Sequence, residues 1–170
     1  MILCIALKFF DFPSLTGGRT DFSPGSGPRI LIVPGAPSVT PLICYEAIFP
    51  AQIGHYKDQA RPGWLLNLTN DAWFGSSSGP YQHFAAARLR AVEEGLPLIR
   101  VANTGLSGVI DSYGRIRIQT NLNEQVAVES HLPASLSGLT WFARHGNTTV
   151  FLIIVMLFCI FHLKFYSAEK

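Results

Sequence analysis

Hydrophobic and polar positions divide this chain into short apolar runs separated by turns rich in glycine, proline and serine. Apolar runs of this length, bounded by such residues, are typical of β-strands. We predict extended segments at residues 29–33, 39–44, 64–71, 96–105 and 124–133. The run at 107–119, "SGVIDSYGRIRIQ", has apolar stretches on both sides of "DSYG" and is predicted to form a β-hairpin. The Gly-, Ser- and Pro-dense segment 13–28 is predicted to be a loop.

Helical periodicity is clearest in "YQHFAAARLRAVEEG", residues 81–95. Its apolar residues recur at helical spacing, and Gly95 stands where a C-terminal cap is expected. The residues predicted to face inward are Phe84, Ala87, Leu89 and Ala91. A shorter helix, interrupted by Pro50, is predicted within residues 45–56. Strands that alternate with helices and then follow one another directly predict an α/β (α+β) fold, with sheets packed face to face and helices outside.

The end of the chain is apolar on every side. No charged residue occurs from Thr148 to Leu163, a stretch that would make a helix about 24 Å long. The hydrocarbon core of a bilayer is about 30 Å thick, so the flanking aromatic residues Phe165 and Tyr166 are needed to complete a span. We predict a transmembrane helix at residues 148–166 and a short tail at 167–170; a buried core helix is the alternative.

Composition agrees with a chain that is partly in a membrane or deeply buried. Only 14% of residues are charged and the mean hydropathy is +0.27. The net charge of +2, without a Lys/Arg cluster, argues against a nucleic-acid partner. The three cysteines, Cys4, Cys44 and Cys159, lie far apart and form no metal-binding motif with histidine. We therefore expect no metal and no cofactor.

Cys44 is the strongest candidate for chemistry. It ends an apolar strand, "PLIC", and precedes a predicted helical turn, "YEAIF". Such a turn exposes a nucleophile and brings backbone N–H groups close to a developing oxyanion. An apolar strand is also a common place for an inert core thiol, and the residues by themselves leave both readings open.

Four motifs carry a family resemblance, in this order along the chain: "ICYE", "NLTNDAWFG", "QHFAAARLRAVEEGLPLIRVANTG" and "SGVIDSYGRI". Together they resemble the second half of a carbon-nitrogen hydrolase (nitrilase-like) domain, expected here at residues 1–147. With the apolar helix added, the chain resembles the bacterial apolipoprotein N-acyltransferase family. The resemblance implies a nitrilase-like αββα sandwich, an inner-membrane location, and a catalytic domain on the periplasmic side.

The activity implied by this resemblance is acyl transfer from a phospholipid, through a cysteine thioester, to the N-terminal amine of a diacylglyceryl lipoprotein. Cys44 matches the nucleophile, and Glu46 matches a glutamate that supports the site or simply a carboxylate favoured at a helix N-terminus. Tyr45 is expected to pack beside the substrate. Trp73 and Phe74, flanked by Gly and Ser, are expected either to form an apolar lid over acyl chains or to anchor their loop.

The chain departs from this family upstream of Cys44. The family has a glutamate base and an oxyanion-binding lysine before the cysteine, whereas here that region offers only Asp11, Asp21 and Lys8, and we assign those roles to none of them. We therefore expect a C-terminal part of a longer enzyme, inactive by itself. A soluble nitrilase-like amidase fragment and a non-catalytic membrane-anchored binding module are the alternatives.

Several other polar residues near the predicted site are interpreted as structural. The Asx-rich strand exit is typical of a turn, and no Ser or Asp partner at recognisable spacing supports a catalytic triad around the helical histidine. The residues interpreted in this way are Asn67, Asn70, Asp71, His83, Arg100 and Asn103.

Overall fold

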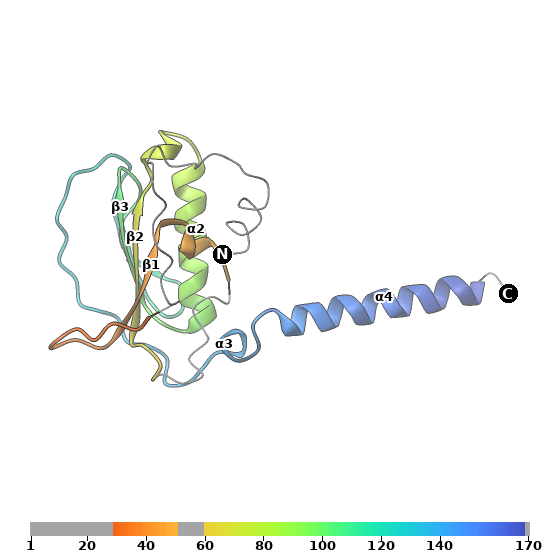
Figure 1. Ribbon diagram of the computed structural model, residues 1–170. Helices are drawn as coiled ribbons and strands as arrows, with labels where there is room; N and C mark the ends of the chain where they lie inside the picture. The colour runs from red at the N-terminus through yellow and green to blue at the C-terminus, as the bar shows by residue number, and fades with distance from the viewer. Residues whose placement is uncertain (1–28, 51–59, 169–170) are drawn as a thin grey trace, which may run out of the picture.

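The computed structural model describes residues 29–50 and 60–168, with side chains through His162. Its described core is one five-stranded sheet with strand order β1-β2-β3-β4-β5 (Figure 1). The strands are β1 (Val39–Ile43), β2 (Trp64–Asn70), β3 (Leu98–Asn103), β4 (Gly108–Ile110) and β5 (Ile116–Gln119). The first three are parallel, and β4 and β5 are antiparallel additions. The α/β class and the predicted hairpin are therefore confirmed.

Helix α2 (Gly79–Glu94) covers one face of this sheet (Figure 1). Its buried residues Phe84, Ala87 and Ala91 belong to the core cluster, together with strand residues such as Leu65 and Leu98. Apolar burial of this kind supplies most of the stability of an amphipathic helix. The predicted inward position of Leu89 is wrong: its side chain is 56% exposed, because the buried stripe continues instead through Arg90 and Glu94.

Gly95 ends α2 as predicted. It adopts a left-handed conformation with φ of 62°, and its N–H bonds the carbonyls of Ala91 and Val92. This conformation carries no Cβ penalty for glycine, which explains why the helix stops there.

Strand alternation separates the two faces of the sheet. Leu65 and Asn67 of β2 are buried towards α2, whereas Leu68 is 42% exposed on the opposite face. On β3, Arg100 is buried and Val101 is 52% exposed. The described residues form one sheet, so the face-to-face packing of two sheets stays a prediction.

Two predicted strands are wrong within the described residues. Residues 29–33 make only a single bridge, between Leu31 and Val39, and residues 124–133 contain no strand. Val126 and Val128 are about half exposed. A β-strand forms only where a neighbouring strand pairs with it, so an apolar run without such a neighbour does not become a strand. The helix predicted within 45–56 is a 3-10 helix, η1 (Cys44–Ile48), and residues 51–59 lie outside the described part.

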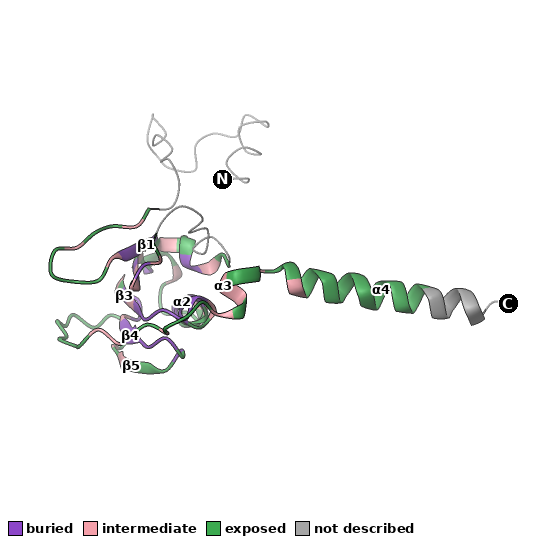
Figure 2. Cartoon of the chain, turned by 90° about the horizontal axis from the view of Figure 1, so that it is seen from below, coloured by how far each residue is buried: buried purple, intermediate pink, exposed green. Residues whose placement is uncertain are grey.

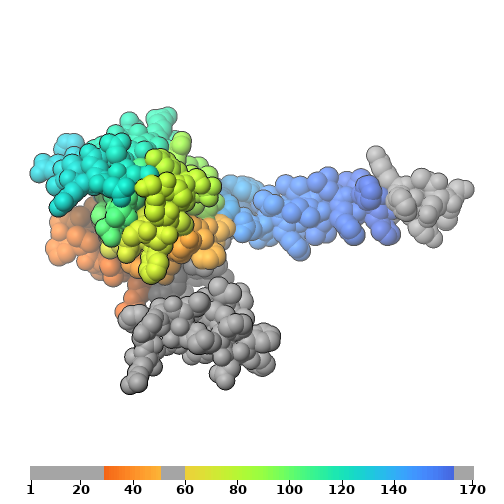
Figure 3. All heavy atoms as spheres, turned by 90° about the horizontal axis from the view of Figure 1, so that it is seen from above, coloured from red at the N-terminus to blue at the C-terminus, as the bar shows by residue number. Residues whose placement is uncertain are grey.

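The C-terminal region leaves the domain as two helices, α3 (Trp141–His145) and α4 (Thr148–Ala168). Figures 2 and 3 show α4 projecting away from the sheet and α2. Its large apolar side chains from Val150 to Phe161 are between 41% and 69% exposed, so the alternative of a buried core helix is wrong for them. Within the described part of the chain, no helix combines the length and the apolarity that a membrane crossing requires.

Candidate functional site

Cys44 occupies a strained turn between β1 and η1. Ile43 before it is extended, whereas Cys44 itself has a φ of +50°, in the left-handed region that non-glycine residues rarely adopt. The thiol is free and half-buried. A side chain held on such a strand-to-helix turn projects from the end of the strand, as a nucleophile requires.

Glu46 closes this turn from the other side. Its carboxylate accepts a hydrogen bond from the Ile43 N–H at 2.7 Å, and its carbonyl accepts one from the Phe49 N–H at 3.3 Å. A carboxylate in this place satisfies a backbone donor that the short helix leaves open. Glu46 therefore shapes the backbone on which Cys44 sits, and a direct chemical role for its carboxylate stays a prediction.

Thr69 of β2 reaches the sulfur from the neighbouring strand. Its Oγ1 lies 3.4 Å from Cys44 Sγ and 3.1 Å from Asp71 Oδ1. Parallel pairing puts the two residues together, since Ile43 pairs with Leu68 and the next step along each strand brings Cys44 beside Thr69. The hydroxyl thus joins the thiol to a buried carboxylate.

Asp71 is 1% exposed and is held on both of its carboxylate oxygens. Its Oδ1 lies 2.9 Å from Nδ1 of His83, and its Oδ2 accepts from Nη2 of Arg100 at 2.7 Å. His83 comes from α2 and Arg100 from β3, so three elements converge on one carboxylate. Buried charges are tolerated when they are paired and hydrogen-bonded in this way.

Arg100 also supports the backbone of the turn through Asn67. One of its guanidinium nitrogens, Nη1, donates to Asn67 Oδ1, and Asn67 Nδ2 donates to the carbonyls of Leu42 at 2.9 Å and Cys44 at 3.4 Å. One buried guanidinium therefore serves both the carbonyl and, through Asp71 and Thr69, the sulfur of Cys44. Burial lowers the pKa of Arg100, while the nearby Asp71 and the Cys44 thiolate act in the opposite direction.

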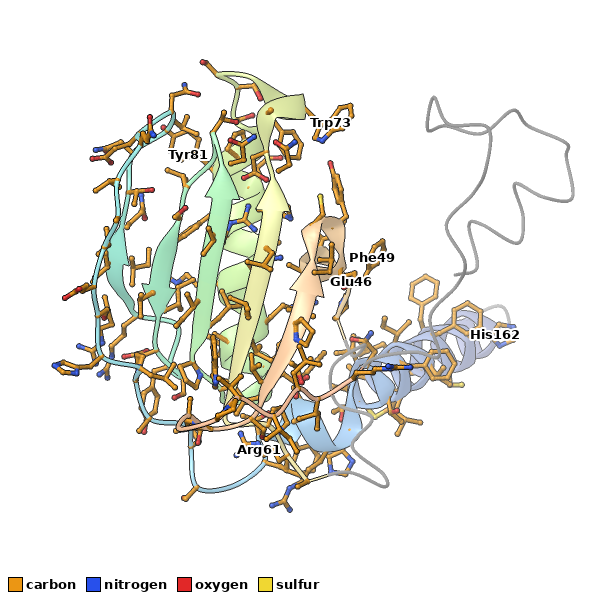
Figure 4. The ribbon with its side chains drawn as sticks, turned by 60° about the vertical axis from the view of Figure 1, so that its left-hand side comes forward. Glu46, Phe49, Arg61, Trp73, Tyr81 and His162 are labelled. Carbon is orange, nitrogen blue, oxygen red and sulfur yellow. The ribbon has the colours of Figure 1, made fainter. Side chains whose placement is uncertain are left out.

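Aromatic side chains form the wall above this network. The ring of Tyr45 stacks on His83 at 5.3 Å between centroids, and Phe74 lies 6.0 Å from Tyr45 and 5.9 Å from His83. Trp73 is on the same short helix as Phe74, η2 (Ala72–Phe74), but is 84% exposed. Figure 4 shows Trp73 projecting outward at this end of the sheet. The structure thus brings Tyr45 and Phe74 together around His83 and leaves Trp73 outside their cluster.

Sequence reasoning missed Thr69 and interpreted Asn67 and Asp71 as structural, and all three lie on one face of β2 and its exit. Asn67, Thr69 and Asp71 are every second residue after buried Leu65, so they lie on the same face of the strand as Leu65. This face changes from apolar to polar towards the end of the strand, and that change was the sequence feature that could have indicated the site. The interpretation of Asn70 as a turn residue is confirmed, because its Oδ1 accepts hydrogen bonds from the Ala72 N–H and from Nδ2 of Asn103. In the described residues no group of three metal-binding side chains occurs.

Comparisons with known proteins identify the family of this chain. The carbon-nitrogen hydrolase family profile matches residues 13–134. A curated apolipoprotein N-acyltransferase from Rhodopseudomonas palustris is 46% identical over 153 residues, which cover 90% of this chain and 28% of that protein. One from Rickettsia typhi is 43% identical over 156 residues, covering 92% of this chain and 31% of that protein. The chain therefore spans about three tenths of the length of these relatives.

One solved structure is also similar. It is a carbon-nitrogen hydrolase superfamily protein from Xanthomonas campestris, at 20% sequence identity and a TM-score of 0.49. The match covers 61% of this chain and 43% of that one.

Proposed function

We propose that this chain, which belongs to the carbon-nitrogen hydrolase family, supplies the cysteine nucleophile of an apolipoprotein N-acyltransferase. The single observation that supports this best is the position of Cys44, half-buried on a strained strand-to-helix turn and joined to a buried polar network. The motif that contains it lies within the segment matched by the family profile.

The proposed reaction has two halves. The Cys44 thiolate attacks an ester carbonyl of a phospholipid, a thioester forms, and the lysophospholipid leaves with a proton as its alcohol. The α-amine of a diacylglyceryl lipoprotein then attacks the thioester, an amide forms, and the thiol returns to Cys44. A thioester is labile enough for an amine to open, which is the reason to use sulfur. We assign the base and the oxyanion-binding lysine to no residue of this chain.

Three aromatic residues are proposed to contact the acyl chain. Tyr45 and Phe74 form the apolar wall next to Cys44, and Trp73 presents its indole to the outside at the same end of the sheet. Large exposed aromatic surface beside a nucleophile favours an apolar substrate. Glu46 is proposed to support the site by keeping the turn closed at Ile43.

The proposal includes a membrane location for α4. The 19 residues from 148 to 166 would measure about 28 Å, close to the roughly 30 Å hydrocarbon core, and the last four of them lie beyond the side chains that the structure describes. Exposed aliphatic and aromatic side chains along it favour lipid over water. We propose that residues 148–166 lie in the bacterial inner membrane, with the sheet and α2 on the periplasmic side.

A chimera tests the assignment of Cys44. The segment of the Rhodopseudomonas palustris relative that this chain matches is replaced by the chain, and transfer from phospholipid to a diacylated lipopeptide is followed over time. We expect transfer by the chimera, loss of at least 100-fold on Cys44→Ala, and no change on Cys159→Ala, the matched cysteine in α4. The isolated chain is expected to show no turnover. Equal transfer by the Cys44→Ala chimera would refute the proposal.

Carbonate washing of membranes that contain the chain tests the location of α4. Retention that is lost on deleting residues 148–170 is the expected result. Release of the intact chain would instead favour the soluble amidase alternative, and retention together with an inactive chimera would favour the membrane-anchored binding module.

A further inference from the structure

We propose that Thr69 is a positioning residue for Cys44, whose hydroxyl turns its one proton between Asp71 and the sulfur as the sulfur gains or loses charge. This rests on the proposed function only in taking Cys44 as the nucleophile. Thr69 lies on β2, is not part of the strand that carries Cys44, and contacts both groups through the same oxygen.

The direction of each hydrogen bond follows from counting protons. A threonine hydroxyl has one proton to donate and lone pairs to accept with. Asp71 forms an ion pair with Arg100 at 2.7 Å, so its oxygens only accept. While Cys44 is a thiol, Thr69 therefore donates to Asp71 Oδ1 and accepts from the S–H. When Cys44 becomes a thiolate, the sulfur is an acceptor too, and the hydroxyl proton turns towards it.

Rotation of the Thr69 hydroxyl costs little free energy at Asp71, because other donors remain on its carboxylate. When Thr69 turns away, Oδ1 keeps its bond with His83 at 2.9 Å and Oδ2 keeps its bond with Arg100. No carboxylate oxygen is left without a donor in either state. A buried carboxylate that lost its only donor would instead oppose the change, since unsatisfied buried groups cost free energy.

The position of the hydroxyl is itself well fixed. Threonine is β-branched, which restricts its first side-chain torsion. Asp71 cannot retreat from it, because the backbone of Gly105 packs against the carboxylate so closely that an added Cβ would lie 2.2 Å from Oδ2. The alternative is that Thr69 is an ordinary strand residue that merely fills space beside Cys44.

Site-resolved alkylation separates the two readings. The full chain in detergent micelles is treated with iodoacetamide between pH 6 and 10, and the labelled fraction of the peptide that carries Cys44, whose thiol is free, is followed by mass spectrometry. Thr69→Val removes the hydroxyl at nearly constant shape, and Thr69→Ser keeps it. Thr40→Val is the matched control: Thr40 is equally β-branched, is buried on β1, and its Oγ1 has no partner within the described residues.

We expect Thr69→Val to slow labelling of Cys44 near pH 7.5 by about three- to tenfold and to move the midpoint of its pH profile upward by roughly 0.5 to 1 unit. Thr69→Ser should stay within about twofold of the parent chain, and Thr40→Val should leave the profile unchanged. Thr69→Ala, which is smaller, carries the same prediction should the valine variant fail to fold.

A profile of Thr69→Val that superimposes on the parent profile would overturn the proposal. So would slower labelling at every pH with an unchanged midpoint, since that reports access to the sulfur rather than stabilisation of its charge. Labelling needs neither lipid nor lipopeptide. An inactive chimera would therefore count against the proposed function and would leave the labelling result for Thr69 unaffected.

Discussion

Charged side chains are buried at both ends of α2, but their hydrogen-bond partners differ. At the N-terminal end, Asp71 has a partner for each oxygen, supplied by His83 and Arg100. At the C-terminal end, Glu94 is 1% exposed, yet its Oε2 has no hydrogen-bond partner among the described residues. The Nε atom of buried Arg90 is unpartnered in the same sense.

The difference lies in which atoms are satisfied. Near Glu94 the donors bind backbone carbonyls: Arg61 donates to the carbonyls of Glu94 at 2.6 Å and of Gly95 at 3.1 Å, and Thr140 donates to that of Glu93. The helix end is thereby capped, and Glu93 Oε1 accepts a hydrogen bond from Arg90 at 2.8 Å, but Oε2 of Glu93 and Oε2 of Glu94 have no partner among the described residues. Burial, with the Glu93 charge adding to it, raises the pKa of Glu94 to about 7.

The comparison teaches that burial by itself does not make a site. The Asp71 carboxylate is paired on both oxygens, although Nε2 of His83 has no partner among the described residues, whereas the Glu94 carboxylate keeps an open acceptor and its pKa is raised. The first arrangement suits a preorganised nucleophile and the second gives stability that varies with proton concentration.

The largest effect should come from breaking the paired end. Asp71→Asn keeps the shape but leaves the buried Arg100 guanidinium without its counter-charge, so we expect about 3–5 kcal/mol less free energy of unfolding. Urea unfolding of the full chain followed by circular dichroism measures it. Arg117→Gln, which breaks the pair of a 54% exposed arginine with Asp111, should cost under about 1 kcal/mol. A loss below 1 kcal/mol for Asp71→Asn would show that the buried Asp71–Arg100 pair contributes no more than an exposed pair.

A smaller effect should follow from crowding the same carboxylate. Gly105→Ala puts a Cβ where Asp71 now lies, so the carboxylate and its partners must shift, at a cost of about 1–3 kcal/mol. Gly138→Ala is the matched control, because its added Cβ meets no atom within 4 Å. Thermal unfolding of the two variants side by side gives the difference. Equal stabilities would mean that the network relaxes freely.

The smallest effect concerns the unpaired end and depends on pH. The folded chain holds the Glu94 proton up to about pH 7, whereas an ordinary glutamate in the unfolded chain releases it near pH 4.5. The folded state therefore binds more protons between these values, and this contribution to stability is lost as the pH rises through about 7. Glu94→Gln should remove that slope and gain roughly 1–2 kcal/mol at pH 8.

Urea unfolding at pH 5 and pH 8 measures this change in slope. Glu129→Gln, on an exposed segment, is the control and should leave the slope as it is. An unchanged slope in Glu94→Gln would show that Glu94 titrates alike in both states.

Sequence patterns predicted the parts of this fold that depend on local order. The strands near Val39, Trp64 and Leu98 and the helix ending at Gly95 were found because apolar runs and glycine or proline boundaries mark them. Residues 124–133 look equally apolar and form no strand in the described chain, because pairing is a property of neighbours rather than of the run.

The residues of the site also divide into those that a local sequence pattern predicts and those that depend on strand pairing. The place of Cys44 at a strand exit, which is a local feature, made it a candidate, and the family resemblance made it the expected nucleophile. The contact of Thr69 with the sulfur spans 25 residues of sequence and depends on the parallel register of β1 and β2. The pairing of Asp71 with Arg100 also requires β3 beside β2. Such relations between strands have no signature in one short motif, which is why Thr69 was not singled out and Asp71 and Arg100 were interpreted as structural.

The left-handed backbone at Cys44 sets a limit on how this chain can be improved. That conformation costs any residue but glycine about 1–2 kcal/mol, and glycine has no sulfur. Selection for thermal resistance without selection for chemistry should therefore accept glycine at this position early. Such a selection is expected to yield a more stable variant that has glycine, and therefore no thiol, at position 44.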